Sequence, residues 1–220
     1  MNTRRQGRSA PPRGPRTVRG TQPIPQVLIT RIGAAELVTR PLAVSDAPAV
    51  QAMHERCSAD TLRLRYLGPF PKMSERMIAF FADPARGRSL VTTYQGEVVA
   101  MTNVMNTGEP GVAEMAFLIE DPWQGQGLGG ILLRHVIAMA PVWKLDELTA
   151  SMYATNRRML ALMRRSGALL PTRFSAVIEV RLPLTGVTAD TVARDTVARD
   201  TVGRDTVTRD TVARDTLVHR

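Results

Sequence analysis

The residues whose types and spacing could do chemistry form a glycine-rich run, Gln124-Gly125-Gln126-Gly127-Leu128-Gly129-Gly130, between two apolar segments. Glycine lets backbone N–H groups come close to a ligand that a side chain would hold away. The apolar spacing after the run predicts a helix, whose N-terminus would point at the same place. Because unpaired N–H groups make a helix N-terminus partly positive, the run predicts a binding site for an anion such as a pyrophosphate.

Three kinds of glycine-rich anion site compete for this run, and their spacings differ. A nucleotide-hydrolase phosphate loop needs Lys followed by Ser or Thr after its last glycine, whereas this chain has Gly130-Ile131. The dinucleotide fingerprint Gly-x-Gly-x-x-Gly is met at 125–130. It also needs an acidic residue at the end of the next strand, but Asp146-Glu147 stand before that strand, so the context does not fit.

The third spacing, Gln-x-x-Gly-x-Gly, is met by Gln124, Gly127 and Gly129, and here the chain resembles the GNAT superfamily of N-acetyltransferases. The resemblance covers residues 36–183. It implies that the loop backbone holds the pyrophosphate of acetyl-CoA, the cosubstrate, and that the preceding strand bonds the pantetheine arm. The cofactor-binding residues that it implies are Phe117, Leu118, Ile119, Gln124, Gly125, Gln126, Gly127, Leu128, Gly129, Gly130 and Asn156.

A narrower resemblance joins the chain to the GNAT domains of bacterial protein lysine acetyltransferases. It rests on 37–42, on Ser45-Asp46, on 58–66 and on the form Trp-Gln-Gly-x-Gly-Leu-Gly at 123–129. Some of those domains are fused to acyl-CoA synthetase-like or cyclic-nucleotide-binding modules, and neither module is found in these 220 residues. The resemblance implies a protein lysine as the acceptor, with a small-molecule amine as the alternative.

The chemistry also needs a base, because an alkyl ammonium with a pKa of ~10.4 is protonated at neutral pH and cannot attack a thioester. Glu114 is the candidate, since its strand runs toward the glycine-rich run and a half-buried carboxylate would have a raised pKa. In the lysine acetyltransferases that the chain resembles, a glutamate at this position is the base. The alternative is an outward-facing residue in a salt bridge. Glu120 and Asp121 are expected to close the strand and face solvent.

The CoA thiolate that leaves must be stabilised or protonated. Many GNAT enzymes use a tyrosine where this chain has Met163, which leaves Tyr153 or solvent as the proton source. The missing tyrosine favours the protein-acetylating branch, and it keeps open a catalytically silent acyl-CoA-binding module that regulates a partner. Tyr153 could also be a packed strand aromatic. Met159, Leu160 and Met163 are expected to be core contacts at helical spacing.

Composition indicates one enzyme-sized domain without a membrane span, in the cytoplasm. A single cysteine, Cys57, excludes an intramolecular disulfide, and its place beside an apolar helix pattern indicates packing rather than nucleophilic chemistry. No residues at metal-ligand spacing are present, so no metal is expected. Direct transfer from acetyl-CoA to the amine is therefore the predicted mechanism. The oligomeric state is left open.

Both ends of the chain differ in composition from the middle. Residues 1–30, rich in arginine and proline, are predicted to be a disordered arm, and a solvated tail is favoured over a nucleic-acid-binding role. Residues 188–220 repeat the pentapeptide Asp-Thr-Val-Ala-Arg. A five-residue period gives neither a helix nor a strand an apolar face, so this tail is also predicted to be disordered.

Between the tails, strands, helices and strands alternate in an order that predicts a mixed α/β sheet with a parallel pair around the helix after the glycine-rich run. In the GNAT fold that pair splays apart and admits the cofactor. A tight hairpin turn is predicted at Gln95-Gly96. The expected strands are 36–42, 89–95, 97–105, 112–120, 147–153 and 174–182, and the expected helices are 46–57, 59–66, 73–82, 128–140 and 156–166.

Overall fold

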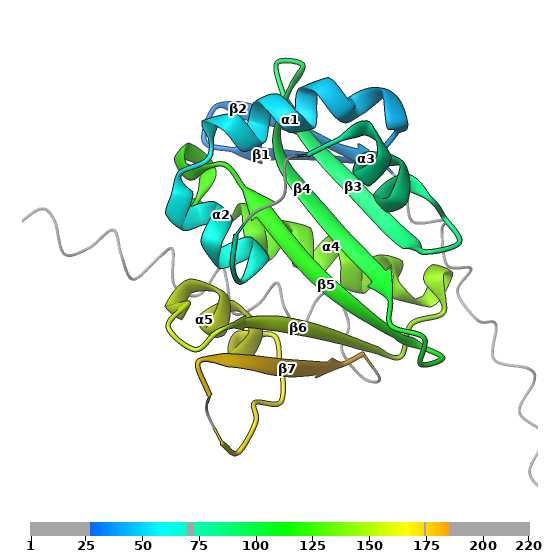
Figure 1. Cartoon of the computed structure of the whole chain (residues 1–220), viewed down its shortest axis with the longest axis vertical. Coiled ribbons are helices and arrows are strands. Elements are labelled where there is room, and N and C mark those ends of the chain that lie inside the picture. The colour runs from blue at the N-terminus through cyan, green and yellow to red at the C-terminus, as the bar shows by residue number, and fades with distance from the viewer. Residues whose placement is uncertain (1–26, 70–72, 174, 185–220) are drawn as a thin grey trace, which may run out of the picture.

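Seven strands form one sheet in which their spatial order equals their order in the chain (Figure 1). The computed structural model describes residues 27–69, 73–173 and 175–184. All neighbouring strands pair antiparallel except β5 and β6, which are parallel. This confirms the predicted mixed α/β sheet. The strands are β1 (Leu28–Ile32), β2 (Ala35–Pro41), β3 (Gly87–Tyr94), β4 (Glu97–Asn106), β5 (Val112–Ile119), β6 (Glu147–Tyr153) and β7 (Val177–Pro183).

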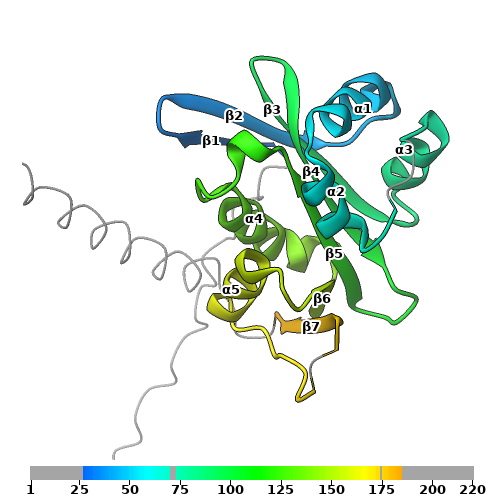
Figure 2. The same ribbon diagram turned by 60° about the vertical axis from the view of Figure 1, so that its left-hand side comes forward.

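Helices cover both faces of the sheet, as Figure 2 shows. One face carries α1 (Ala47–Arg56), α2 (Ala59–Tyr66) and α3 (Glu75–Ala82), and the other carries α4 (Leu128–Trp143) and α5 (Arg157–Arg165). Helix α4 connects the two parallel strands, as a parallel pair requires.

Alternating residues of the central strands supply the two cores. On β5, Ala113 and Met115 pack in the cluster that includes α4 and α5, whereas Leu118 packs in the cluster that includes α1 and α3. On β4, Val104 packs in the cluster that includes α4 and α5, and Met101 packs in the cluster that includes α1 and α3. Because successive side chains of a strand point to opposite faces, each residue of β5 can be assigned to one face.

Local signals explain several element boundaries. Ser58 begins α2 as its N-cap, where its hydroxyl accepts a hydrogen bond from the Thr61 N–H (3.2 Å). The predicted turn at Gln95-Gly96 is confirmed, and both residues adopt positive φ angles of 51° and 87°. Positive φ at both central positions is the geometry that two-residue hairpins favour.

Several boundaries differ from the prediction, among them the starts of α3 and β7, which lie at Glu75 and Val177. Strand β1 was not predicted, and residues 28–30, which were assigned to the arm, belong to it. It pairs with β2 through a turn at Gly33, whose φ is 57°. Helix α4 was predicted to stop before Pro141 but runs to Trp143, with Pro141 in its last turn. The rest of the arm and the repeat tail lie outside the described residues.

Candidate active site

Strands β5 and β6 are paired only at their beginnings. Their parallel register comprises Val112 with Glu147, Ala113 with Leu148 and Glu114 with Thr149. Beyond these pairs, β5 continues beside β4 and β6 continues beside β7, so the two strands separate toward their C-terminal ends (Figure 1). We call this divergence the strand fork. Ligands of open α/β sheets bind outside the carboxyl ends of the strands, which is where the fork opens.

The glycine loop, Gln124–Gly130, follows β5 in the chain and includes the first three residues of α4. Gly125 and Gly127 have φ angles of 75° and 89°, a left-handed conformation that other residues rarely adopt. Gly127 is also the N-cap of α4 and supplies no side-chain cap. The first helical hydrogen bond runs from the Ile131 N–H to the Gly127 carbonyl (3.1 Å), so the N–H groups of the preceding residues are the unpaired ones of a helix N-terminus. The loop therefore has the form of an anion site.

At Gly129 and Gly130, the last two glycines of the loop, the φ angle does not require glycine. A Cβ on Gly129 would lie 3.5 Å from Ile119 Cδ1 and 3.6 Å from Leu162 Cδ2, which are ordinary packing distances. A Cβ on Gly130 would also make only ordinary contacts. The fold itself thus tolerates a small side chain at both positions.

Gln124 ties the glycine loop to three elements. Its side-chain amide donates to the Thr61 hydroxyl of α2 and to the Ile119 carbonyl of β5, both at 2.9 Å. Its side-chain oxygen accepts from the Arg158 guanidinium of α5 (3.0 Å). Gln126 is exposed, and its amide donates to the Pro122 carbonyl. Gln124 is therefore a structural anchor that holds the loop at the mouth of the strand fork.

Glu114 lies on β5 at the start of the strand fork. Its neighbours Ala113 and Met115 face α4, so Glu114 faces the side of the sheet that carries α2. The side chain is exposed, which corrects the expectation of a half-buried carboxylate. It makes no ion pair within the described part of the chain, so the alternative of a salt-bridged surface residue has no support there.

Comparison with known proteins fits this geometry. The model of the acetyltransferase (GNAT) family matches residues 51–168. The chain belongs to the GNAT family. Members of the family transfer an acetyl group from acetyl-CoA, so the protein is an N-acetyltransferase with acetyl-CoA as cosubstrate. A glycine loop with unpaired N–H groups beside two diverging strands is a fitting site for that cosubstrate.

Solved structures show the same GNAT fold. The GNAT domain of S. lividans PAT is similar with a TM-score of 0.65 and 23% identity, over 74% of this chain and 99% of that one. Mycobacterium smegmatis RimJ in complex with CoA-disulfide has a TM-score of 0.61 and 17% identity, over 78% and 93%. Salmonella typhimurium yncA with its cofactor acetyl-CoA has a TM-score of 0.56 and 17% identity, over 67% and 94%.

The structure places the other residues that were expected to bind the cofactor in different environments. Phe117 and Ile119 are partly buried on the α4 side of β5, whereas Leu118 is buried in the opposite core. Leu128 is buried as well, so both leucines can offer a ligand only their backbone. Asn156 caps α5, where its side-chain oxygen accepts from the Met159 N–H (3.2 Å).

Tyr153 is the last residue of β6. Ala150 and Met152 of the same strand face the α4 core, so Tyr153, which follows Met152, faces the opposite side of the sheet, as Glu114 does. It is partly buried, and the Arg63 Cζ lies 5.0 Å from the centroid of its ring. At the position of the usual GNAT tyrosine, Met163 is fully buried in the core, as predicted.

Sequence reasoning missed Arg158, which the structure brings to the glycine loop. A signal was available: α5 begins with Arg157 and Arg158, although the first turn of a helix favours acidic residues. Basic residues against the helix dipole indicate a role other than helix stability.

The expectation that Glu120 and Asp121 face solvent is wrong for Glu120, whereas Asp121 is exposed as expected. Glu120 is buried, and its carboxylate pairs with the Arg56 guanidinium of α1 at 2.8 Å. Asp121 is exposed but accepts hydrogen bonds from the Ser58 N–H and hydroxyl and from the Thr61 hydroxyl. Burial disfavours the ionised Asp121, yet these bonds outweigh it and hold its pKa below the ordinary value. Both residues fix α1 and α2 against the end of β5.

Several other features carry no catalytic assignment. Burial raises the pKa of Cys57 to about 12, so the residue stays a thiol and packs in the core, as predicted. Among the described residues, no three His, Cys, Asp or Glu side chains gather where they could hold a metal ion. No helix in that part of the chain has the length and apolarity needed to cross a membrane.

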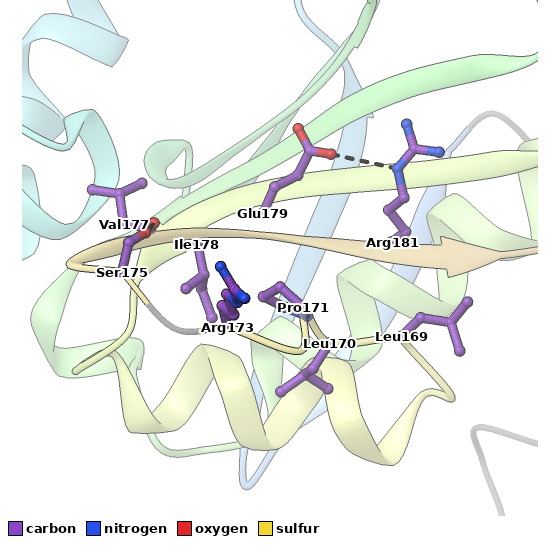
Figure 3. Close-up of a pocket in the computed structure, with 9 residues that line it drawn as sticks. All are labelled: Leu169, Leu170, Pro171, Arg173, Ser175, Val177, Ile178, Glu179 and Arg181. Carbon is purple, nitrogen blue, oxygen red and sulfur yellow. Dashed lines mark hydrogen bonds and ion pairs between the residues drawn. The ribbon is translucent and has the colours of Figure 1, made fainter.

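A cavity of about 370 Å³ lies elsewhere, between β7 and the segment that precedes it (Figure 3). Leu170 and Pro171 line one side of it, and Glu179 pairs with Arg181 on β7. The cavity shares no residue with the glycine loop.

Proposed function

We propose that this GNAT enzyme transfers the acetyl group directly to the side-chain amine of a protein lysine, with Glu114 as the general base. The observation that carries the proposal is the position of Glu114, at the start of the strand fork and on the face opposite α4. A cosubstrate held by the N-terminus of α4 leaves that face open for the acceptor.

The cosubstrate would be held by the glycine loop and by the edge of β5. The N–H groups of Leu128, Gly129 and Gly130 suit the pyrophosphate, and the Arg158 guanidinium supplies a cation beside them. Beyond Glu114, β5 has no strand partner on the side of β6, so its backbone can bond an extended arm. When bound, acetyl-CoA supplies the activated thioester.

Glu114 would take the proton of the acceptor ammonium, directly or through a water molecule. Its exposure lets a lysine reach it from solvent, and it makes no ion pair in the described residues that would have to be broken first. General base catalysis of this kind contributes a factor of ~10²–10⁴ to the rate.

For the leaving thiolate we propose Tyr153 or water as the proton source. Met163 is buried and has no proton to give. Tyr153 lies on the same face as Glu114, and the Arg63 cation over its ring makes this end of the fork favourable for a thiolate.

A protein lysine is favoured over a small amine by the narrower resemblance to lysine acetyltransferases and by the absence of the usual tyrosine. The similarity to the S. lividans PAT domain over 99% of that domain agrees with this branch. A cytoplasmic location is part of the same proposal, and the lone buried thiol of Cys57 is compatible with it.

The test is a screen for release of CoA from acetyl-CoA in the presence of lysine peptides and of small amines. Release with lysine peptides supports the proposal. Release only with small amines would replace it, and binding of acetyl-CoA without release for any acceptor would indicate a silent regulatory module.

A further inference from the structure

Arg65, on α2, is a partly buried cation without an anionic partner in the described residues. Its guanidinium makes one hydrogen bond, from Nη2 to the Asn103 side-chain oxygen (2.8 Å). Its Nε is shielded from solvent and has no hydrogen-bond partner. No carboxylate of residues 27–69, 73–173 or 175–184 lies within ion-pair distance of it. Buried hydrogen-bond donors normally have a partner, so the Nε of Arg65 calls for an explanation.

The guanidinium is fixed by a chain of contacts on one side. Its Cζ lies 4.9 Å from the centroid of the Tyr66 ring. The Tyr66 hydroxyl is hydrogen-bonded to His54 Nε2, and His54 Nδ1 lies 2.8 Å from the Val50 carbonyl. A carbonyl only accepts, so Nδ1 carries the proton and Nε2 accepts from the tyrosine. Burial lowers the pKa of His54, which keeps this neutral tautomer.

A second set of contacts fixes the guanidinium from the sheet. The Asn103 amide nitrogen donates to the Ser89 hydroxyl (2.9 Å), so the oxygen of the same amide must point at Arg65. Asn103 lies on β4 directly beside Ala116 of β5. A rigid, preorganised guanidinium loses little entropy when it binds a ligand.

Arg65 lies on the face of the sheet where the acceptor would enter. Burial lowers the pKa of Arg65, and the charge of Glu114 opposes this shift, although the two form no ion pair among the described residues. Asn103 and Glu114 belong to the same face, because Met105, two residues from Asn103, is the β4 partner of Glu114. A molecule whose amine reaches Glu114 therefore passes the face of the sheet on which the Arg65 cation is held by Asn103 and Tyr66.

We propose that Arg65 binds a carboxylate of the acceptor and so selects amines that carry a carboxylate close by. This inference rests on the proposed function. The carboxylate would supply the missing counter-charge, and the planar guanidinium suits two-pronged binding of a carboxylate. Its source is either an acidic residue beside the target lysine of a protein or the carboxylate of a small amino acid.

The experiment compares acceptors that differ only in that charge. One pair is a lysine peptide with glutamate or with glutamine beside the lysine, and the other is free lysine and lysinamide. For the wild-type protein we expect the carboxylate member of at least one pair to have a kcat/KM ~10–100-fold higher, expressed mainly in KM. The pair that shows the effect identifies the source.

Three variants test whether Arg65 causes the preference for the acceptor that carries the carboxylate. Arg65→Met should bring the ratio within each pair close to one while acetyl-CoA affinity, measured by titration, is unchanged. Arg65→Lys keeps the charge without the planar fork and should retain part of the preference, which also covers the case in which Arg65→Met does not fold. Arg76→Met, which changes an exposed arginine of α3, should leave the ratio unchanged.

The results distinguish failure of the carboxylate site from failure of the proposed function. Equal kcat/KM values within both pairs for the wild type, or a preference that survives in Arg65→Met, overturns the carboxylate site while CoA release still upholds the proposed function. No CoA release with any acceptor overturns the proposed function, and this inference with it.

Discussion

Glu114 of β5 and Thr149 of β6 form the last pair at which the two parallel strands remain in register. The residue that we propose as the base therefore stands where the sheet opens. The glycine loop lies at the far end of the same strand, so one strand links the two functional parts of the site.

The first prediction concerns the base. Glu114→Gln keeps the size and shape of the side chain but cannot take a proton, so turnover should fall by ~10²–10⁴-fold while acetyl-CoA affinity survives. The loss should shrink at high pH, where the amine arrives deprotonated. Steady-state rates and a binding titration check this. Glu179→Gln, an exposed glutamate of the edge strand β7, is the matched control. Unchanged turnover in Glu114→Gln would assign the base to water or another group.

The second prediction separates the two roles of glycine in the loop. Gly129→Asp leaves the backbone unstrained but adds bulk and negative charge at the anion site, so the variant should fold and lose CoA affinity. Gly127→Asp should in addition lower the melting temperature, because φ is 89° there. Calorimetric CoA titration and thermal unfolding measure the two effects. Gly68→Asp, at an open position, is the control, and undiminished affinity in Gly129→Asp would exclude this loop as the site.

The third prediction concerns the ion pair between Arg56 and Glu120. Glu120→Ala leaves the Arg56 guanidinium without its carboxylate and should lower the free energy of unfolding by ~1–3 kcal/mol, measured by urea denaturation. Glu36→Ala removes an exposed pair with Arg31 and should cost less than ~0.5 kcal/mol. Equal costs for the two variants would show that burial of Glu120 does not matter.

The fourth prediction is a loss of stability in mild acid. Burial lowers the pKa of both His54 and His135 in the folded state. The unfolded chain, with an ordinary histidine pKa of ~6.5, therefore binds more protons, so stability is fully present above that pH and falls as the pH drops below it. Thermal unfolding between pH 7.5 and 5.5 shows the effect. The double variant His54→Gln, His135→Leu should have a flatter profile, and an unchanged slope would contradict the assignment.

The fifth prediction concerns the ends of the chain. Composition and the five-residue repeat give neither end a way to form a packed core, so residues 27–184 alone should retain turnover. Removal of residues 1–33 also deletes β1 and should lower the melting temperature of the shortened chain. Loss of turnover in the folded 27–184 chain would assign the arm or the repeat tail a part in the reaction.

The sequence by itself determined the parts of this protein that depend on neighbouring residues. The glycine loop, the helix after it and the hairpin at Gln95-Gly96 follow from local backbone preferences and from apolar periodicity. The same signals placed the parallel pair around α4. Strand β1 was not predicted, because its alternating segment is short and follows a stretch rich in arginine and proline.

Only the tertiary structure decided which side chains meet. Arg56 and Glu120 are 64 residues apart, and Arg65 and Asn103 are 38 apart. Such partners leave no periodic trace in the sequence, because they are set by how helices pack across a sheet. The exposure of Glu114 depends likewise on the strand fork, where β6 leaves β5. Residue type and spacing thus indicate what chemistry is available, and packing determines which groups can perform it together.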